Sequence, residues 1–500
     1  MQRSLRFARN FSWNLLGQVG TWASAFLLIP YLVRRMGVEA YGLYLLLGTA
    51  SSYLLILTFG AGSASVVHGA GRAGGKDGRG LREVLSWSVG IHLGGVALGA
   101  VLLAVAAPSI ADSWFQVPPR LREEAVWILR CAALGAVFAG LLQAANSLLQ
   151  GLQRFDWQNM IALTQSVATP LGAGALLAAG FGLRQIGLWY VVVNAVLAVA
   201  ALAVARGLVA AFPLRASSEG RSLRGFLATC RGFWLAQCAS VVTLQFDKLF
   251  IGRTLALGDL TLWAVPAGLL MRLQTVPANI AGVIMPMSSE LTAQEAEEGL
   301  ARMYVKTVRA VLWSTLPAQV LLFALMPQFL TLWVGPAFGV MSVWPARVLA
   351  LAQAVSLLNV IPLNMASARG KPLYLTTWLW LQASLLVLSW YLLAPRLGLL
   401  GIALGFLLSS SLPLPFFLAV IHRGILRLPL ARYLREALYV PCASAALLLA
   451  LVFPVHHLAT SWLALLALSA AGLALYYGST WRLMEDSDRA LVRKLLRLTA

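Results

Sequence analysis

The stretch LTLWAVPAGLLMRLQTVPANIAGVIMPM, at residues 260–287, is almost wholly apolar, and its length decides the class of fold. At about 1.5 Å per residue, a helix over this stretch exceeds the roughly 30 Å hydrocarbon core of a bilayer. Arg272 lies near its middle, where an arginine costs about 2.5–3.5 kcal/mol on insertion scales. Thr275 and Asn279 follow at helical spacing, so one face carries three polar groups. The stretch predicts a membrane span whose arginine either is paired inside a helix bundle or meets an anionic substrate in a water-filled cavity.

The composition extends this prediction to the whole chain. Hydrophobic residues make up 60% of the 500 residues and charged residues 11%, and the mean hydropathy is +0.79. Apolar runs of membrane-spanning length recur throughout, which is typical of a polytopic helical membrane protein. The net charge of +20 fits an excess of Lys and Arg in cytoplasmic loops facing membrane lipids, and does not indicate nucleic-acid binding.

The apolar runs predict an all-α polytopic membrane protein with about fourteen spans. Most Lys and Arg residues fall in the loops on one side, which predicts an even number of spans, both termini in the cytoplasm and a multi-pass protein of the bacterial inner membrane. The expected spans are residues 11–33, 41–67, 83–107, 125–149, 158–182, 187–205, 226–249, 260–286, 304–327, 343–367, 372–394, 398–421, 437–453 and 460–480.

The sequence suggests an internal repeat among these spans. An offset of 219 residues aligns Arg34 with Arg253 and Tyr44 with Trp263, at matching span ends. We therefore expect two pseudo-symmetric six-helix bundles and two extra helices. The expected parts are an N-terminal bundle at 1–205, a Ser-, Gly- and Arg-rich cytoplasmic linker at 206–225, a C-terminal bundle at 226–421, helices 13 and 14 at 422–480, and a cytoplasmic amphipathic tail at 481–500.

Polar residues recur at helical spacing on early spans of both halves. A single such face can form hydrogen bonds between helices, each contributing about 0.6–2 kcal/mol. Several faces in both halves instead favour a hydrated cavity at the interface of the halves. Two further arginines lie inside spans on the external side, where snorkelling to the surface explains them about as well as a cavity does. The candidate substrate-binding residues are Arg272, Asn14, Gln18, Gln237, Asn279, Arg130 and Arg347.

Asp247 is an acidic residue placed clearly inside a span, toward its outer end. It could form a structural ion pair with a cavity arginine, carry a proton or bind Na⁺, or close an outer gate against Arg253. Lys248 can snorkel outward on its long stem. Asp247, Lys248 and Arg253 are therefore candidate coupling or gating residues.

Catalytic patterns are missing from the sequence. It has no P-loop, no GxSxG elbow, no HExxH and no metal-ligand spacing among its four cysteines. We expect a protein that is not an enzyme, holds no metal and has no cofactor. Its energy source would then be a coupling ion (H⁺ or Na⁺) or the membrane potential.

Several motifs, in order and at the expected spans, carry a family resemblance. They are NFSWNLLGQ at 10–18, PYLVRRMGVEAYGLY at 30–44, LLQGLQRF at 148–155, FDKLFIGR at 246–253, MPMSSELTA at 285–293 and LTLWVG at 330–335. Together they resemble the polysaccharide and O-antigen flippases of the multidrug/oligosaccharidyl-lipid/polysaccharide exporter superfamily. The resemblance covers nearly all of the chain.

The resemblance implies two six-helix bundles around a central cavity, with alternating access. It implies translocation of a polyprenyl-pyrophosphate-linked oligosaccharide from the inner to the outer leaflet, for O-antigen, capsule or exopolysaccharide biosynthesis, beside a polysaccharide polymerase and other assembly proteins. It also implies cavity cations that bind the pyrophosphate, a role that Arg272 fits by position. The alternatives are a lipid II flippase, a multidrug exporter of the same superfamily, and a membrane-embedded polysaccharide polymerase or ligase.

Overall fold

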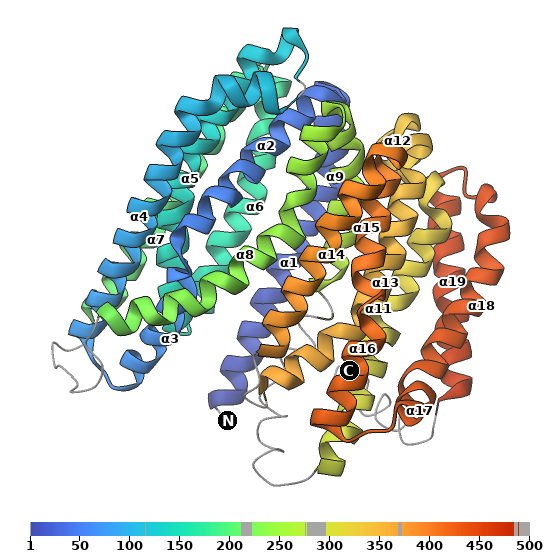
Figure 1. Ribbon diagram of the computed structural model, residues 1–500. Helices are drawn as coiled ribbons and strands as arrows, with labels where there is room; N and C mark the ends of the chain where they lie inside the picture. The colour runs from blue at the N-terminus through green and yellow to red at the C-terminus, as the bar shows by residue number, and fades with distance from the viewer. Residues whose placement is uncertain are drawn as a thin grey trace. The chain divides into compact units, whose positions relative to one another are not determined.

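The computed structural model describes residues 2–115, 117–211, 223–275, 277, 297–368, 373–484 and 489. The side chains of residues 2–17, 19, 297, 367 and 368 lie outside this description. Helices and short connections account for all of the described backbone, which contains no strand (Figure 1). The helices fall into two compact units, Met1–Thr261 and Leu262–Ala500.

The first unit is built from long apolar helices with one broken span. In it α5 packs against α4 and α7, and α1 packs against α6 (Figure 1). Its helices are α1 (Gln2–Met36), α2 (Val38–Leu54), η1 (Leu55–Thr58), α3 (Ala61–Gly74), α4 (Gly78–Ser109), η2 (Ile110–Trp114), η3 (Pro119–Leu121), α5 (Arg122–Gly151), α6 (Phe155–Ala178), α7 (Leu183–Ala210), α8 (Leu223–Thr254) and the start of α9 (Leu257–Leu273).

The second unit centres on α11, the longest helix described there. It packs against α13 and α18, and α18 pairs with α19, drawn in red in Figure 1. Its remaining helices are α11 (Glu297–Trp333), α12 (Pro336–Met341), α13 (Val343–Ala368), α14 (Leu373–Leu397), α15 (Leu399–Ser411), α16 (Leu414–Ile421), η4 (His422–Leu426), α17 (Leu430–Tyr433), η5 (Leu434–Leu438), α18 (Tyr439–Val455), η6 (His456–Leu458) and α19 (Trp462–Leu483).

The predicted all-α polytopic fold is confirmed. Over its described residues, each predicted span coincides with a helix or with a helix broken by a short turn, and residues 276 and 278–286 of the span expected at 260–286 lie outside the description. Within the described residues, 11 helical segments are long and apolar enough to cross a membrane. The predicted linker and tail lie largely outside the described residues. The predicted bundle boundary stays a prediction, although α8 lies in the first compact unit, whereas the sequence assigned it to the second bundle.

The span expected at residues 41–67 is broken in the structure. Its first half, α2, tightens into the 3₁₀ turn η1, and Phe59 and Gly60 then adopt left-handed φ angles of 50° and 77° before α3 begins. The positive φ suits Gly60, since a glycine adopts it without steric cost. Gly95 of α4 lies so close to η1 that a β-carbon there would be 2.0 Å from the Leu57 carbonyl oxygen. The break therefore requires that α4 has no side chain at residue 95, where it packs against η1.

This packing predicts opposite effects for two adjacent glycines of α4. Gly95→Ala should lower the free energy of unfolding by about 1–3 kcal/mol, because its methyl group collides with the η1 backbone. Gly94→Ala should be neutral or should stabilise by up to about 1 kcal/mol, since nothing lies within 4 Å of its added carbon. Thermal unfolding of the two purified variants in detergent measures the difference. Equal melting temperatures would show that α4 does not contact the break this closely.

Candidate functional site

Two side chains of α8 donate hydrogen bonds to the backbone of the break in the second span. Gln237 donates through Nε2 to the Leu55 carbonyl at 3.0 Å, and Trp234 donates through Nε1 to the Ile56 carbonyl at 3.0 Å. Non-helical backbone at membrane depth is tolerated where protein groups satisfy it. The structure thus gives Gln237 a structural contact, and its predicted role in substrate binding stays a prediction.

Asp247 lies farther along α8 and is almost completely buried, with 1% of its side chain exposed. The Lys248 ammonium lies 3.4 Å from Asp247 Oδ1 and donates to Gln245 Oε1 at 2.9 Å. This is the geometry of a buried ion pair, in which an ammonium offsets part of the cost of burying a carboxylate. The sequence suggested a cavity arginine as a partner of Asp247, and the structure places the Lys248 ammonium beside it instead of pointing Lys248 outward. The predicted coupling role of Asp247 and Lys248 stays a prediction.

Arg253 lies in the last turn of α8 and contacts the turn after α4. Its Nη1 donates to the Ser113 carbonyl at 2.5 Å, and its guanidinium carbon lies 5.7 Å from the centre of the Trp114 ring. The same turn is held by Arg122, which donates to both Asp112 carboxylate oxygens at 2.5 Å. Arg253 is thus engaged with a backbone carbonyl and an indole. Its predicted gating role is untested by these contacts.

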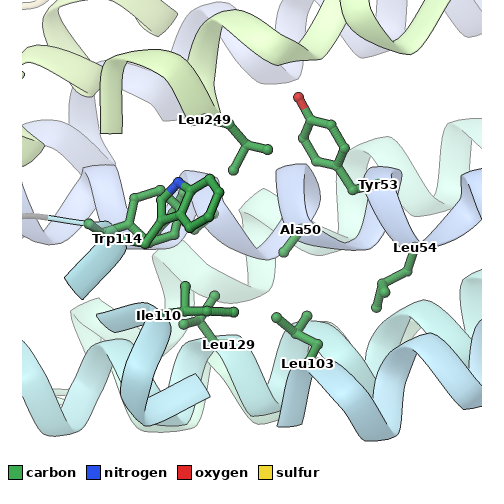
Figure 2. A pocket seen from close by; sticks show the side chains of 10 residues that line it. Ala50, Tyr53, Leu54, Leu103, Ile110, Trp114, Leu129 and Leu249 are labelled. Carbon is green, nitrogen blue, oxygen red and sulfur yellow. The ribbon is translucent and has the colours of Figure 1, made fainter. Parts of the chain in front are cut away.

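An apolar pocket of about 270 Å³ lies between α2, α4, α5, η2 and α8. In Figure 2, Leu103, Ile110 and Leu129 line one wall, and Tyr53 and Leu249 lie across from them. Trp114 lines one side of the pocket and belongs to the turn that Arg253 contacts, so the pocket borders this turn. The lining suits an apolar chain and contains no charged residue, so this pocket does not supply a phosphate-binding site.

Arg272 lies in the last turn of α9, in the second unit. It is half-buried, and its Nη1 donates to the carbonyl of Gly268 on its own helix at 2.9 Å. Fifteen residues separate it from Leu257, which places it about 22 Å along the helix. Beside it, Gln274 donates to the Gln353 carbonyl of α13 at 2.8 Å. The structure therefore gives Arg272 a contact with a carbonyl of its own helix, and its predicted role in substrate binding stays a prediction.

Arg347 of α13 is 5% exposed and joins three helices. Its Nε donates to the Phe323 carbonyl at 2.9 Å and its Nη2 to the Ala324 carbonyl at 3.2 Å, both on α11. In a regular helix Phe323 O would accept from residue 327, but Pro327 has no amide hydrogen to donate. The guanidinium thus reaches α11 at the turn where the helix lacks a donor.

Aromatic rings enclose the same guanidinium. The ring centres of Phe323, Trp344 and Phe453 lie 5.6, 5.2 and 5.1 Å from the Arg347 guanidinium carbon. A cation over an aromatic face gains about 0.5–1 kcal/mol at an exposed site and about 2 kcal/mol when desolvated. Phe453 belongs to α18, so Arg347 fastens this extra helix to α11 and α13. These contacts give Arg347 a structural role, and its predicted substrate-binding role stays a prediction.

The remaining predicted residues divide by exposure. Gln18 is half-buried on α1, and Arg130 is exposed on α5. The side chain of Asn14 and all of Asn279 lie outside the described residues. Several of the polar faces act as helix contacts within each unit: Thr21 bonds Ser166 of α6 at 2.9 Å, for example. The contacts of Trp234, Trp344 and Phe453 were not predicted from the sequence. In the sequence these residues are aromatic residues within apolar spans, with no other distinguishing feature.

Solved structures similar to this chain are transporters. The lipid II flippase MurJ in an inward closed conformation aligns with a TM-score of 0.66 at 10% identity, over 94% of this chain and 99% of that one. An inward-facing multidrug resistance MATE family transporter of the MOP superfamily aligns with a TM-score of 0.62 at 15% identity, over 83% and 95%. A MOP superfamily transporter from Pyrococcus furiosus aligns with a TM-score of 0.54 at 15% identity, over 84% and 94%. At these identities the likeness establishes the fold.

The comparison with sequence families is more specific. No curated protein sequence matches the chain. The family model of the polysaccharide biosynthesis proteins matches residues 7–292, which is more than half of the chain. This match runs through the motifs at 10–18, 30–44, 148–155 and 246–253 that carried the resemblance in the sequence. The chain is therefore a multi-pass membrane protein that belongs to the polysaccharide biosynthesis protein family, with the fold of the MOP superfamily transporters.

Proposed function

We propose that the protein is a flippase that moves a polyprenyl-pyrophosphate-linked oligosaccharide from the inner to the outer leaflet of the bacterial inner membrane. The product would supply O-antigen, capsule or exopolysaccharide biosynthesis. The observation that carries the proposal is the family match over residues 7–292, on an all-α fold of two compact units. Alternating access between those units is the mechanism that we propose, with both termini in the cytoplasm.

The chemistry of the substrate sets what the protein must provide. An unpaired hydroxyl group in hydrocarbon costs several kcal/mol, so a sugar chain needs a hydrated path, while the polyprenyl tail can stay in the lipid. A pyrophosphate needs a permanent cation, and arginine stays charged and binds phosphate oxygens through two parallel hydrogen bonds. In this proposal Arg272 binds the pyrophosphate, with Asn279 on the same predicted face, and Asn14, Gln18 and Gln237 contact the sugars.

The membrane potential can bias the direction of transport without ATP. An inside-negative potential favours outward movement of an anion by about 2.3 kcal/mol per charge at 100 mV. Two charges on the pyrophosphate therefore gain about 4–5 kcal/mol. A coupling ion would add to this bias, and Asp247 is the residue that we propose for carrying it.

A deletion strain tests the transport step in the cell. Removing the gene should make the lipid-linked oligosaccharide accumulate on the cytoplasmic face of the inner membrane, and a plasmid copy should reverse this. Accumulation of lipid II instead would favour the lipid II flippase, and hypersensitivity to cationic drugs with normal glycan transfer would favour the multidrug exporter. Normal transfer of the oligosaccharide to the outer face, in a strain with no backup flippase, would refute the proposal.

Asp247 gives a separate prediction about the energy source. An asparagine keeps the shape of the side chain but cannot take up or release a proton. Asp247→Asn should therefore remove any stimulation of transport by an imposed pH gradient, while Asp247→Glu should retain it. Transport in proteoliposomes with and without the gradient measures this. Unchanged stimulation in Asp247→Asn would leave Asp247 with the structural ion pair alone.

A further inference from the structure

A groove runs along the chain segment that enters the span Leu430–Leu458. Its volume is about 810 Å³. The lining comes from successive turns of α17, η5 and α18, and Arg435 is its one charged residue. The lining residues are Ala431, Leu434, Arg435, Leu438, Tyr439, Cys442 and Ala443.

The opposite face of the same segment is fixed in the protein interior. Tyr433 is fully buried, stacks on Tyr304 with ring centres 5.4 Å apart, and meets the His422 ring edge-on at 4.7 Å. Ala437, one turn farther along, is also fully buried. The groove is therefore preformed, because the backbone that carries it is held from behind by packed rings.

The segment is strongly basic where it meets the groove. Arg423, Arg427, Arg432 and Arg435 are all exposed and fall within 13 residues of sequence. Arg432 donates to Glu436 at 2.8 Å, so its charge is partly offset. Arg435 forms no hydrogen bond or ion pair with any residue that the structure describes. A cation at the end of an apolar groove is thus available to an outside anion.

We propose that this groove binds an anionic glycerophospholipid. The lipid phosphate pairs with Arg435, and an acyl chain lies along Leu434, Leu438 and Cys442. Arg435 and Cys442 are seven residues apart, so this wall extends about 10 Å toward the membrane interior. A basic segment between two spans faces the cytoplasmic leaflet, where anionic lipids concentrate. The charge and the apolar wall match the two halves of one phospholipid.

Cys442 allows a direct test, because it is exposed in the groove while Cys131 and Cys230 are buried. The protein carries Cys238→Ser, to remove the half-buried thiol, and is placed in nanodiscs of phosphatidylcholine with or without phosphatidylglycerol. The rate of labelling of Cys442 by an uncharged maleimide is then measured. The matched variants are Arg435→Gln and Arg432→Gln, which change the net charge equally but differ in whether the arginine lines the groove. Arg435→Lys serves as the conservative variant.

Phosphatidylglycerol should slow labelling about fivefold in the parent protein, in Arg432→Gln and in Arg435→Lys, since one basic residue paired with an anionic headgroup contributes that order of affinity and Arg432 does not line the groove. Arg435→Gln should label at the same rate in both lipids. Equal rates in both lipids for the parent protein, or undiminished protection in Arg435→Gln, would overturn the proposal. Equal protection by inorganic phosphate in phosphatidylcholine discs would identify a free-anion site instead, and protection only in discs with two copies would identify a protein contact. The test measures no transport, so its outcome is independent of the proposed flippase activity.

Discussion

Replacing Arg272 with glutamine should reduce transport of the lipid-linked oligosaccharide by about 10- to 100-fold, since a hydrogen bond to a charged group is worth about 1.5–3 kcal/mol. The protein should still fold, because Arg272 donates to a carbonyl of its own helix, at Gly268, and glutamine fits the same half-buried position. Transport per folded molecule in proteoliposomes, with protein level checked by size-exclusion chromatography, measures the effect.

The controls for Arg272 separate charge from geometry. Arg272→Lys keeps the charge but not the paired donors, so it should retain an intermediate activity. Arg302→Gln removes an exposed arginine from the second unit and should leave transport unchanged. Full transport in Arg272→Gln at normal protein level would remove Arg272 from the substrate site.

Replacing Arg347 with glutamine should, unlike Arg272→Gln, cause a large loss of stability. The change removes the donors to the Phe323 and Ala324 carbonyls and the cation between three rings. Leaving a buried carbonyl unsatisfied costs about 1–3 kcal/mol, and the ring contacts add to this cost. For a unit of this size we expect the melting temperature to fall by about 5–10 °C. Thermal unfolding of the purified protein in detergent measures it.

Two variants show whether the effect belongs to the contacts of Arg347. Arg347→Lys keeps a cation near the rings but cannot reach both carbonyls, so its melting temperature should fall by less. Arg130→Gln removes an exposed arginine of α5 and should change stability by no more than about 0.5 kcal/mol. A melting temperature of Arg347→Gln equal to that of the parent protein would mean that the arginine does not fasten α18 to α11.

The spans could be predicted from the sequence because the bilayer imposes their length and apolar character. The break at η1 could not, because residues 55–60 are mainly apolar and the hydrogen bonds that satisfy the break come from Gln237 and Trp234, about 180 residues away. The hydrogen bond from Arg347 to the Phe323 carbonyl was missed for a similar reason. A proline marks a carbonyl without its helical donor, but the sequence does not say which distant side chain reaches it.

The candidate site was harder to predict than the fold because helix rotation decides what a polar side chain meets. Gln237 and Thr21 have the spacing expected of a cavity face, and the structure joins both to neighbouring helices. Arg272 differs from them in that burying an arginine costs more than burying an amide or a hydroxyl, so its position near mid-membrane carries more information. Its depth in the membrane stays a prediction.

Reconstituted transport tests the flippase proposal most directly. The purified protein is placed in liposomes that contain a polyprenyl-pyrophosphate-linked oligosaccharide in both leaflets. A lectin added outside the vesicles binds the oligosaccharides of the outer leaflet, and the bound fraction is measured. Liposomes with the protein should expose nearly all of the oligosaccharide, whereas protein-free liposomes, and those with Arg272→Gln over the same period, should expose about half, the outer leaflet alone. If only about half of the oligosaccharide is exposed with the native protein, although a membrane potential is applied and the protein is shown to be incorporated, the account is contradicted.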